Sequence, residues 1–123
     1  MKNGPPIIES IIPTGMIIGA NKVDAVDISD YESADIILNL NNPVSKDLFE
    51  KYDVILDSGT LEHIFNTPVA LENICNMLKP EGSFFSTGPS SNFIDHGFYS
   101  FSPTLYFDFF GANGFKDMRS YLR

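Results

Sequence analysis

Four short apolar runs, rich in β-branched or aromatic residues, follow an N-terminal segment of mixed character. They are Val23–Ser29, Asp35–Leu40, Asp53–Gly59 and Ser83–Gly88. Each run is nearly continuous in apolar character and reaches an acidic, amide or glycine residue near its end. Such runs are typical of strands in a parallel sheet that is covered on both faces. The sequence therefore predicts four strands of a mostly parallel sheet.

Helices are predicted between the third and fourth runs and again after the fourth. In the first helix, Thr67 is the expected N-cap and Pro68 the first helical residue, and apolar residues recur at helical spacing. These residues are Leu71, Ile74, Cys75 and Leu78. Lys79–Gly82 should then form a turn, and the second helix should run from Ser102–Pro103 to Asn113–Gly114. The strand–helix–strand order predicts an α/β fold with right-handed crossovers.

Residues 1–21 carry the weakest pattern. Pro6–Ile12 is compatible with a strand, and Met16–Ala20 with a short helix or another strand. Charged, proline and glycine residues interrupt the apolar stretch, so it resembles neither a secretory signal nor a transmembrane span. We expect one domain over residues 1–123 and a cytoplasmic location.

The amino-acid composition excludes several classes of binding partner for this domain. The formal net charge of −8 argues against nucleic acid and against an anionic membrane surface, because both are bound through Lys/Arg-rich surfaces. Eleven Phe and five Tyr supply bulky core material, and a single cysteine excludes an internal disulfide and a cysteine-cluster metal site. The expected partner is a small molecule.

Polar residues close the predicted strands, and in open α/β sheets ligands bind beyond the carboxyl ends of the strands. Asp27, Asn39, Asp57–Gly59 and Gly88–Ser90 hold these positions. A carboxylate there can accept two hydrogen bonds from a ribose diol, and an amide can pair with the edge of an adenine. The alternative is that Asp and Asn only form local turns, as both residue types favour. The other acidic residues nearby, Asp24, Asp30, Glu32 and Asp35, are expected to be exposed charges.

Three stretches, VDAVDISDYESADIILNLNNPV, YDVILDSGTLEHIFN and ALENICNMLKPEGSFF, resemble the central part of class I S-adenosylmethionine-dependent methyltransferases of the small-molecule, type 11-like kind. The resemblance covers roughly residues 22–115. It implies a Rossmann-like, mostly parallel sheet with flanking helices, S-adenosylmethionine as cofactor, and methyl transfer to a small-molecule acceptor. It departs from the family pattern at Asn39, where Asp is more usual, and at Glu81, where Gly is usual.

The resemblance also assigns the cofactor contacts residue by residue. The acid that ends the second family strand holds the ribose, the polar residue after the third strand meets the adenine, and the end of the fourth strand lies near the methionine part. The implied cofactor-binding residues are Asp27, Ile28, Asn39, Leu40, Asp57, Ser58 and Gly59.

Glu62 and His63, in the LEHI pattern at the rim of the implied pocket, are the best general-base candidates, because a hydroxyl or amine acceptor must lose a proton. On a helix these neighbours would point about 100° apart, so we do not expect them to act as one dyad. His96 and Tyr99 are candidate substrate contacts, with aromatic packing of their loop as the alternative. His63 and His96 have no evident third ligand, so no metal site is expected.

The glycine-rich turn that methyltransferases carry after their first strand has no counterpart before Asp27. Ile12–Gly15 offers one glycine, and ten residues separate Ile12 from Val23, too few for a crossover helix with its loops. We therefore expect a fold truncated at the N-terminus, whose methyl transfer can be impaired. A non-catalytic methyltransferase-like structural or partner module is the main alternative. A phospho-receiver domain is a remote one, since Glu9 alone stands where that fold needs paired carboxylates.

In the family's sheet the first strand lies in the middle, between the second and the fourth. An empty central position would leave two rows of unpaired backbone groups, each costing about 1–3 kcal/mol when buried. We predict that Pro6–Ile12 fills this position. The alternative is that a second copy of the chain supplies the strand, which would make a homodimer.

Overall fold

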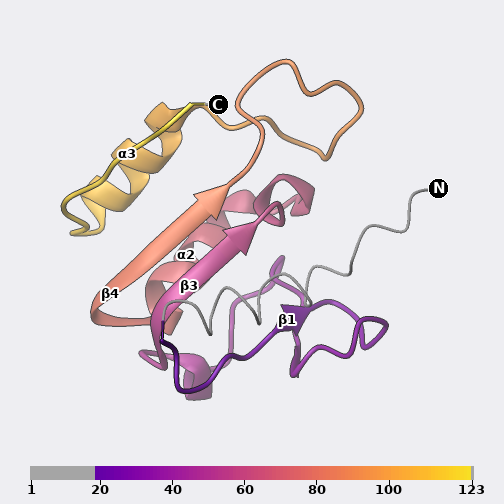
Figure 1. Cartoon of the computed structure of the whole chain (residues 1–123), viewed down its shortest axis with the longest axis vertical. Coiled ribbons are helices and arrows are strands. Elements are labelled where there is room, and N and C mark those ends of the chain that lie inside the picture. Colours follow the sequence, from indigo (N-terminus) through magenta and orange to yellow (C-terminus); the bar gives the residue numbers. More distant parts are fainter. Residues whose placement is uncertain (1–18, 123) are drawn as a thin grey trace.

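A computed structural model describes residues 19–122 of the chain. Figure 1 shows an α/β arrangement, with helices beside the strands. In chain order they are β1 (Val26–Asp27), β2 (Ile36–Ile37), η1 (Lys46–Leu48), β3 (Tyr52–Ser58), η2 (Leu61–His63), α2 (Thr67–Met77), β4 (Leu78–Thr87) and α3 (Pro103–Ala112).

The strands form two parallel pairs rather than one continuous sheet within residues 19–122. β1 pairs with β2, and β3 pairs with β4. The predicted α/β class and the parallel pairing are confirmed, whereas a complete Rossmann-like sheet is not seen in this part of the chain. The predicted central strand, Pro6–Ile12, lies outside the described residues.

Side chains at the start of both pairs join them. The hydroxyl of Tyr52, at the beginning of β3, donates a hydrogen bond to Oδ2 of Asp24 at 3.1 Å. Asp24 also forms an ion pair with Lys22 at 2.8 Å. Asp35 Oδ2 accepts from the amide of Ala25 at 2.8 Å. The expectation of an exposed charge was wrong for Asp24, whose side chain is 6% exposed, whereas Asp35 is exposed as predicted but also bonds the backbone of Ala25.

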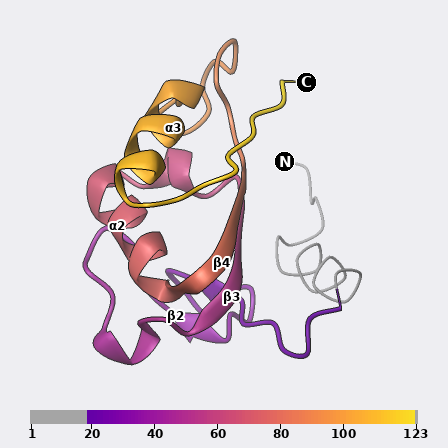
Figure 2. The same ribbon diagram turned by 90° about the vertical axis from the view of Figure 1, so that its left-hand side faces the viewer.

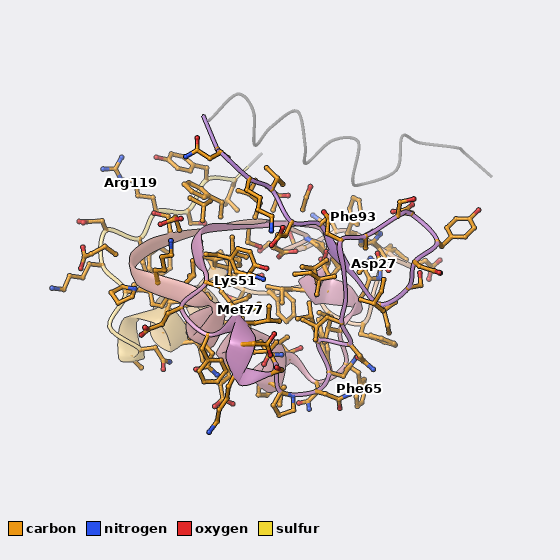
Figure 3. The ribbon with its side chains drawn as sticks, turned by 90° about the horizontal axis from the view of Figure 1, so that it is seen from below. Asp27, Lys51, Phe65, Met77, Phe93 and Arg119 are labelled. Carbon is orange, nitrogen blue, oxygen red and sulfur yellow. The ribbon has the colours of Figure 1, made fainter. Side chains whose placement is uncertain are left out.

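The main core lies between the β3–β4 pair and the two long helices. Figure 2 shows α2 and α3 on the same side of these strands. Ile55 and Phe84 are partners in the parallel register and contact this core, whereas Phe85 is 59% exposed on the other face. Met77, near the middle of Figure 3, is buried in a second cluster with Val44 and Leu48.

α2 begins one residue from the predicted position. Asn66 is its N-cap, and Thr67 is the first helical residue, whose hydroxyl donates to the carbonyl of Ile64 at 3.2 Å. The prediction of Thr67 as the N-cap was therefore wrong. Asn66 takes that position and is held there by two hydrogen bonds to Asn41.

The residues after α2 also differ from the prediction. β4 starts directly at Leu78, and Lys79–Gly82 lies within it as an irregularity, where the register passes from Tyr52↔Leu78 to Val54↔Ser83. Glu81 has φ +64°, a left-handed conformation that favours glycine. This explains why glycine is usual at that point of the pattern.

α3 agrees with the sequence. The Ser102 side chain accepts from the amide of Thr104 at 3.3 Å, Pro103 is in the first turn, and Gly114 beyond the helix end has φ +84°. The predicted caps of this helix are confirmed. No helix in residues 19–122 combines the length and the apolar character needed to cross a membrane.

Candidate functional site

Asp57, near the carboxyl end of β3, positions the turn that follows the strand. Its Oδ1 accepts from the amides of Thr60 at 2.9 Å and Leu61 at 3.4 Å, and its Oδ2 accepts from the Ser86 hydroxyl at 2.7 Å. Burial raises the pKa of Asp57, while the hydrogen bond from Ser86 opposes that change. The carboxylate therefore fixes η2 to the ends of β3 and β4, and a direct cofactor contact by this side chain stays a prediction.

η2 brings a buried carboxylate against two imidazoles. The Glu62 side chain is 2% exposed, and its Oε1 lies 3.0 Å from His96 Nε2 and 4.0 Å from His63 Nε2. The two histidine rings are in edge contact, with centroids 4.8 Å apart. Sequence reasoning missed this convergence, because His96 lies 34 residues beyond Glu62 in the chain.

That Glu62 and His63 do not act as one dyad stays a prediction, although the geometry behind it differs from the observed one: Glu62 Oε1 and His63 Nε2 are 4.0 Å apart. The prediction assumed a continuing helix, whereas η2 ends at His63 and Ile64 is extended, with φ −101° and ψ 115°. The angle between successive Cα–Cβ bonds does not fix the ends of such long side chains. Glu62 and His63 therefore reach the same edge of the molecule.

Three glycines allow the backbone to approach Glu62. A Cβ at Gly59 (φ +85°) would lie 3.3 Å from Oε1, and one at Gly88 would lie 3.5 Å from Oε2. A Cβ at Gly97 (φ +67°) would lie only 2.7 Å from the Glu62 carbonyl oxygen. Gly59 and Gly88 follow the ends of β3 and β4, so Glu62 lies at the carboxyl edge of that strand pair.

The loop between β4 and α3, drawn in orange at the top of Figure 1, bonds both the backbone and the carboxylate of Glu62. The amides of Phe98 and Tyr99 donate to the Glu62 carbonyl at 2.7 and 3.3 Å. The Tyr99 hydroxyl donates to the Phe65 carbonyl at 2.9 Å, and its ring stacks on Phe101. Tyr99 therefore has the packing role that was the alternative to a substrate contact, and its contact with substrate stays a prediction.

Three exposed phenylalanines lie in the same chain segments as the three polar groups, and one of them packs on His96. Phe93 packs its ring edge-on against His96 with centroids 4.7 Å apart, and Phe65 does the same with Phe98 at 5.7 Å. All three phenylalanines are more than half exposed. Phe65 lies at the lower edge of the molecule in Figure 3. A polar centre with an apolar rim suits a ligand that has both kinds of surface.

The other predicted contacts lie at the ends of β1 and β2. Asp27 Oδ1 accepts from the amide of Ser29 at 2.9 Å, and Asn39 Oδ1 accepts from the amide of Asn41 at 3.0 Å. Both residues therefore close local turns, although Asp27 ends a parallel strand as predicted.

The flanking residues that were predicted with them differ in exposure. Ile28 is 65% exposed, whereas Leu40 packs against both apolar clusters. Ser58 and Gly59 lie beyond Asp57 at the end of β3.

A family model described as a methyltransferase domain matches residues 22–102. The chain belongs to this methyltransferase family. The matched stretch of the methyltransferase domain includes all four strands, α2 and the Glu62–His63–His96 cluster, and it ends where α3 begins. Neither a curated protein nor a solved structure matches the chain. The family match decides against the phospho-receiver alternative.

Proposed function

We propose that this domain uses S-adenosylmethionine to methylate a small-molecule acceptor, bound at the carboxyl edge beside Glu62. The observation that carries the proposal is the buried Glu62 carboxylate, held against His63 and His96 where β3 and β4 end. A family of methyltransferase domains matches this stretch of chain. Buried titratable groups in contact at a strand-end edge are typical of functional sites.

The cofactor is proposed to lie across the ends of the strands. Asp27 ends β1 with a carboxylate that can accept from a ribose diol, and Asn39 follows β2 with an amide that can meet an adenine edge. Gly59, directly after β3, is proposed to lie near the methionine part, and its φ of +85° is a conformation that favours glycine. The residues present therefore fit the cofactor.

The chain's own contribution is to orient the acceptor and to accept its proton. When bound, S-adenosylmethionine would supply an electrophilic methyl group on a sulfonium, with S-adenosylhomocysteine as the leaving group. Holding the two reactants in line supplies much of the acceleration. His63, half exposed beside Glu62, is proposed to take the proton that a hydroxyl or amine acceptor loses. His96 and the exposed phenylalanines would orient the acceptor.

Calorimetric titration with S-adenosylhomocysteine tests the cofactor site. Asp27→Ala should weaken binding by about 2–4 kcal/mol, because charged hydrogen bonds to the diol are lost. Asn39→Ala should weaken it less. Asp30→Ala, an exposed acid in the same loop, is the matched control and should bind like the wild type. Equal affinities of wild type and Asp27→Ala would exclude the ribose role.

The same titration decides the alternative of a non-catalytic partner module. That alternative is favoured by the local turns at Asp27 and Asn39, which give both side chains a structural purpose. A folded chain that binds no S-adenosylhomocysteine at millimolar concentration would support it.

A further inference from the structure

We propose that Glu62, His63 and His96 bind a divalent transition-metal ion of the zinc class. One ligand atom from each residue lies within 4.8 Å of the other two. The binding site would use side chains from two segments, η2 and the loop between β4 and α3. Metal binding by this cluster does not depend on the proposed methyl transfer.

One distance between the ligand atoms matches those around a bound ion, and the others exceed them, with all three atoms within 4.8 Å of one another. Metal bonds of 2.0–2.2 Å at tetrahedral or octahedral angles place neighbouring ligand atoms about 2.8–3.6 Å apart. Glu62 Oε1 and His96 Nε2 are already 3.0 Å apart. His63 Nε2 is 4.0 Å from the same oxygen, so it needs to move by roughly 1 Å. The His63 side chain is 50% exposed, which leaves room for that movement.

The carboxylate is held in place before any ion binds. Glu62 is 2% exposed, its carbonyl accepts from the Phe98 amide, and Gly59 and Gly97 lie against it. A buried carboxylate is costly unless hydrogen bonds or a cation compensate it. His96 supplies a hydrogen bond in the structure, and a cation shared with His63 would compensate the charge more fully.

The ligand set selects the class of ion. Two imidazole nitrogens and one carboxylate oxygen suit zinc, iron(II), cobalt(II) or nickel(II), whereas calcium and magnesium prefer oxygen ligands alone. The chain has two histidines, and its one cysteine, Cys75, lies in α2. Three protein ligands leave at least one coordination position open.

That open position would face the side on which His63 and His96 are partly exposed, beside Phe93 and Phe98. An oxygen or nitrogen of the acceptor could occupy it. In the metal-bound form His63 is a ligand and no longer the proton acceptor, and the ion would instead lower the pKa of the bound hydroxyl. This extension rests on the proposed function, whereas the metal site itself does not.

Titration of the full chain, purified without a histidine tag, with zinc chloride at pH 7.5 tests the site. Binding should saturate at one ion per chain. His96→Gln and His63→Gln should each weaken it at least tenfold, since even indirect partners of metal ligands change affinity by about 10–100-fold. Cys75→Ser should bind zinc like the wild type. The visible spectrum of the cobalt(II) form should show no thiolate charge-transfer band.

Failure to saturate at one ion, or unchanged zinc affinity in His63→Gln and His96→Gln with a native circular-dichroism spectrum, would overturn the metal site. The histidine variants are preferred to Glu62 variants because both rings are partly exposed and easier to replace without unfolding. Titration of the same samples with S-adenosylhomocysteine keeps the outcomes separate. A chain that binds the cofactor product but no zinc refutes only the metal site.

Discussion

Among the glycines with positive φ, Gly97 is the one whose replacement by alanine should destabilise the domain most. The new Cβ would lie 2.7 Å from the carbonyl oxygen and 3.0 Å from Cγ of Glu62. Real Cβ atoms do not approach backbone atoms so closely, so the loop must move. The movement would lengthen the hydrogen bond from the Phe98 amide to the Glu62 carbonyl, now 2.7 Å.

Two contributions add to the expected loss. An L-residue in the left-handed region costs about 1–2 kcal/mol, and Gly97 has φ +67°. Relief of the steric overlap costs about 1–3 kcal/mol more, as for an added methyl group in a packed core. We therefore expect Gly97→Ala to lower the free energy of unfolding by about 2–5 kcal/mol, a large share of a typical domain's stability.

Gly114→Ala is the matched control. Gly114 has φ +84°, but a Cβ there would have no neighbour within 4 Å. Only the conformational cost of about 1–2 kcal/mol should remain. Urea unfolding followed by circular dichroism gives both values. Losses that agree within about 0.5 kcal/mol, the usual size of a surface effect, would show that the close approach to Glu62 is not real.

Four further substitutions test other parts of the structure. Burial raises the pKa of Asp57, so the wild type loses stability as the pH rises from the usual carboxyl pKa of ~3.9 through the higher folded pKa. Asparagine does not titrate, so the free energy of unfolding of Asp57→Asn should rise relative to that of the wild type between pH about 3 and 7. Urea unfolding at both pH values measures this, and a pH-independent difference would contradict it. Asn73→Ala should lower the free energy of unfolding by about 2–4 kcal/mol, because the buried Asn73 amide hydrogen-bonds three backbone groups. Glu72→Ala, at the exposed neighbouring position, is the control and should lower it by less than ~0.5 kcal/mol. Burial and a hydrogen bond raise the pKa of Tyr52 to about 12. The wild type should therefore lose stability between pH ~10 and 12 more steeply than Tyr52→Phe, and parallel thermal-melting curves would refute this. Glu81→Gly should raise the free energy of unfolding by about 0.5–1 kcal/mol, since φ is +64° there, and a lower melting temperature would argue against the left-handed conformation.

The sequence predicted best those features that depend on neighbouring residues. The start and end of α3 follow from Ser102–Pro103 and Asn113–Gly114, and the structure shows the expected cap and left-handed glycine. The presence of the four described strands and their parallel pairing also follow from the continuous apolar runs. The extent of β1 and β2 does not: each has two paired residues, although their apolar runs are longer, because pairing depends on what lies alongside.

Contacts between residues far apart in the chain could not be predicted from the sequence. The partners of Glu62 come from a loop about thirty residues away, and no local pattern marks Gly97 as the point of closest approach. Asn73 resembles any polar residue on a helix, yet it is 1% exposed and ties α2 to the segment after β2. In each case a buried polar group shows its importance only through the partners that satisfy it.

Glu62 belongs both to the packing of the loop and to the proposed site, which affects how its variants must be interpreted. Its carbonyl anchors the loop through the Phe98 amide, while its carboxylate faces His96. A substitution keeps this carbonyl but removes the side chain that lies against Gly97 and His96, so loss of activity in a Glu62 variant would combine a disturbed loop with a missing carboxylate. His63 makes no backbone anchor of this kind in the described part of the chain, and its side chain is half exposed. A His63 variant with unchanged unfolding free energy but reduced zinc or acceptor binding would separate the two effects. The same loss in His96→Gln would then assign the chemistry to the imidazole pair rather than to the fold.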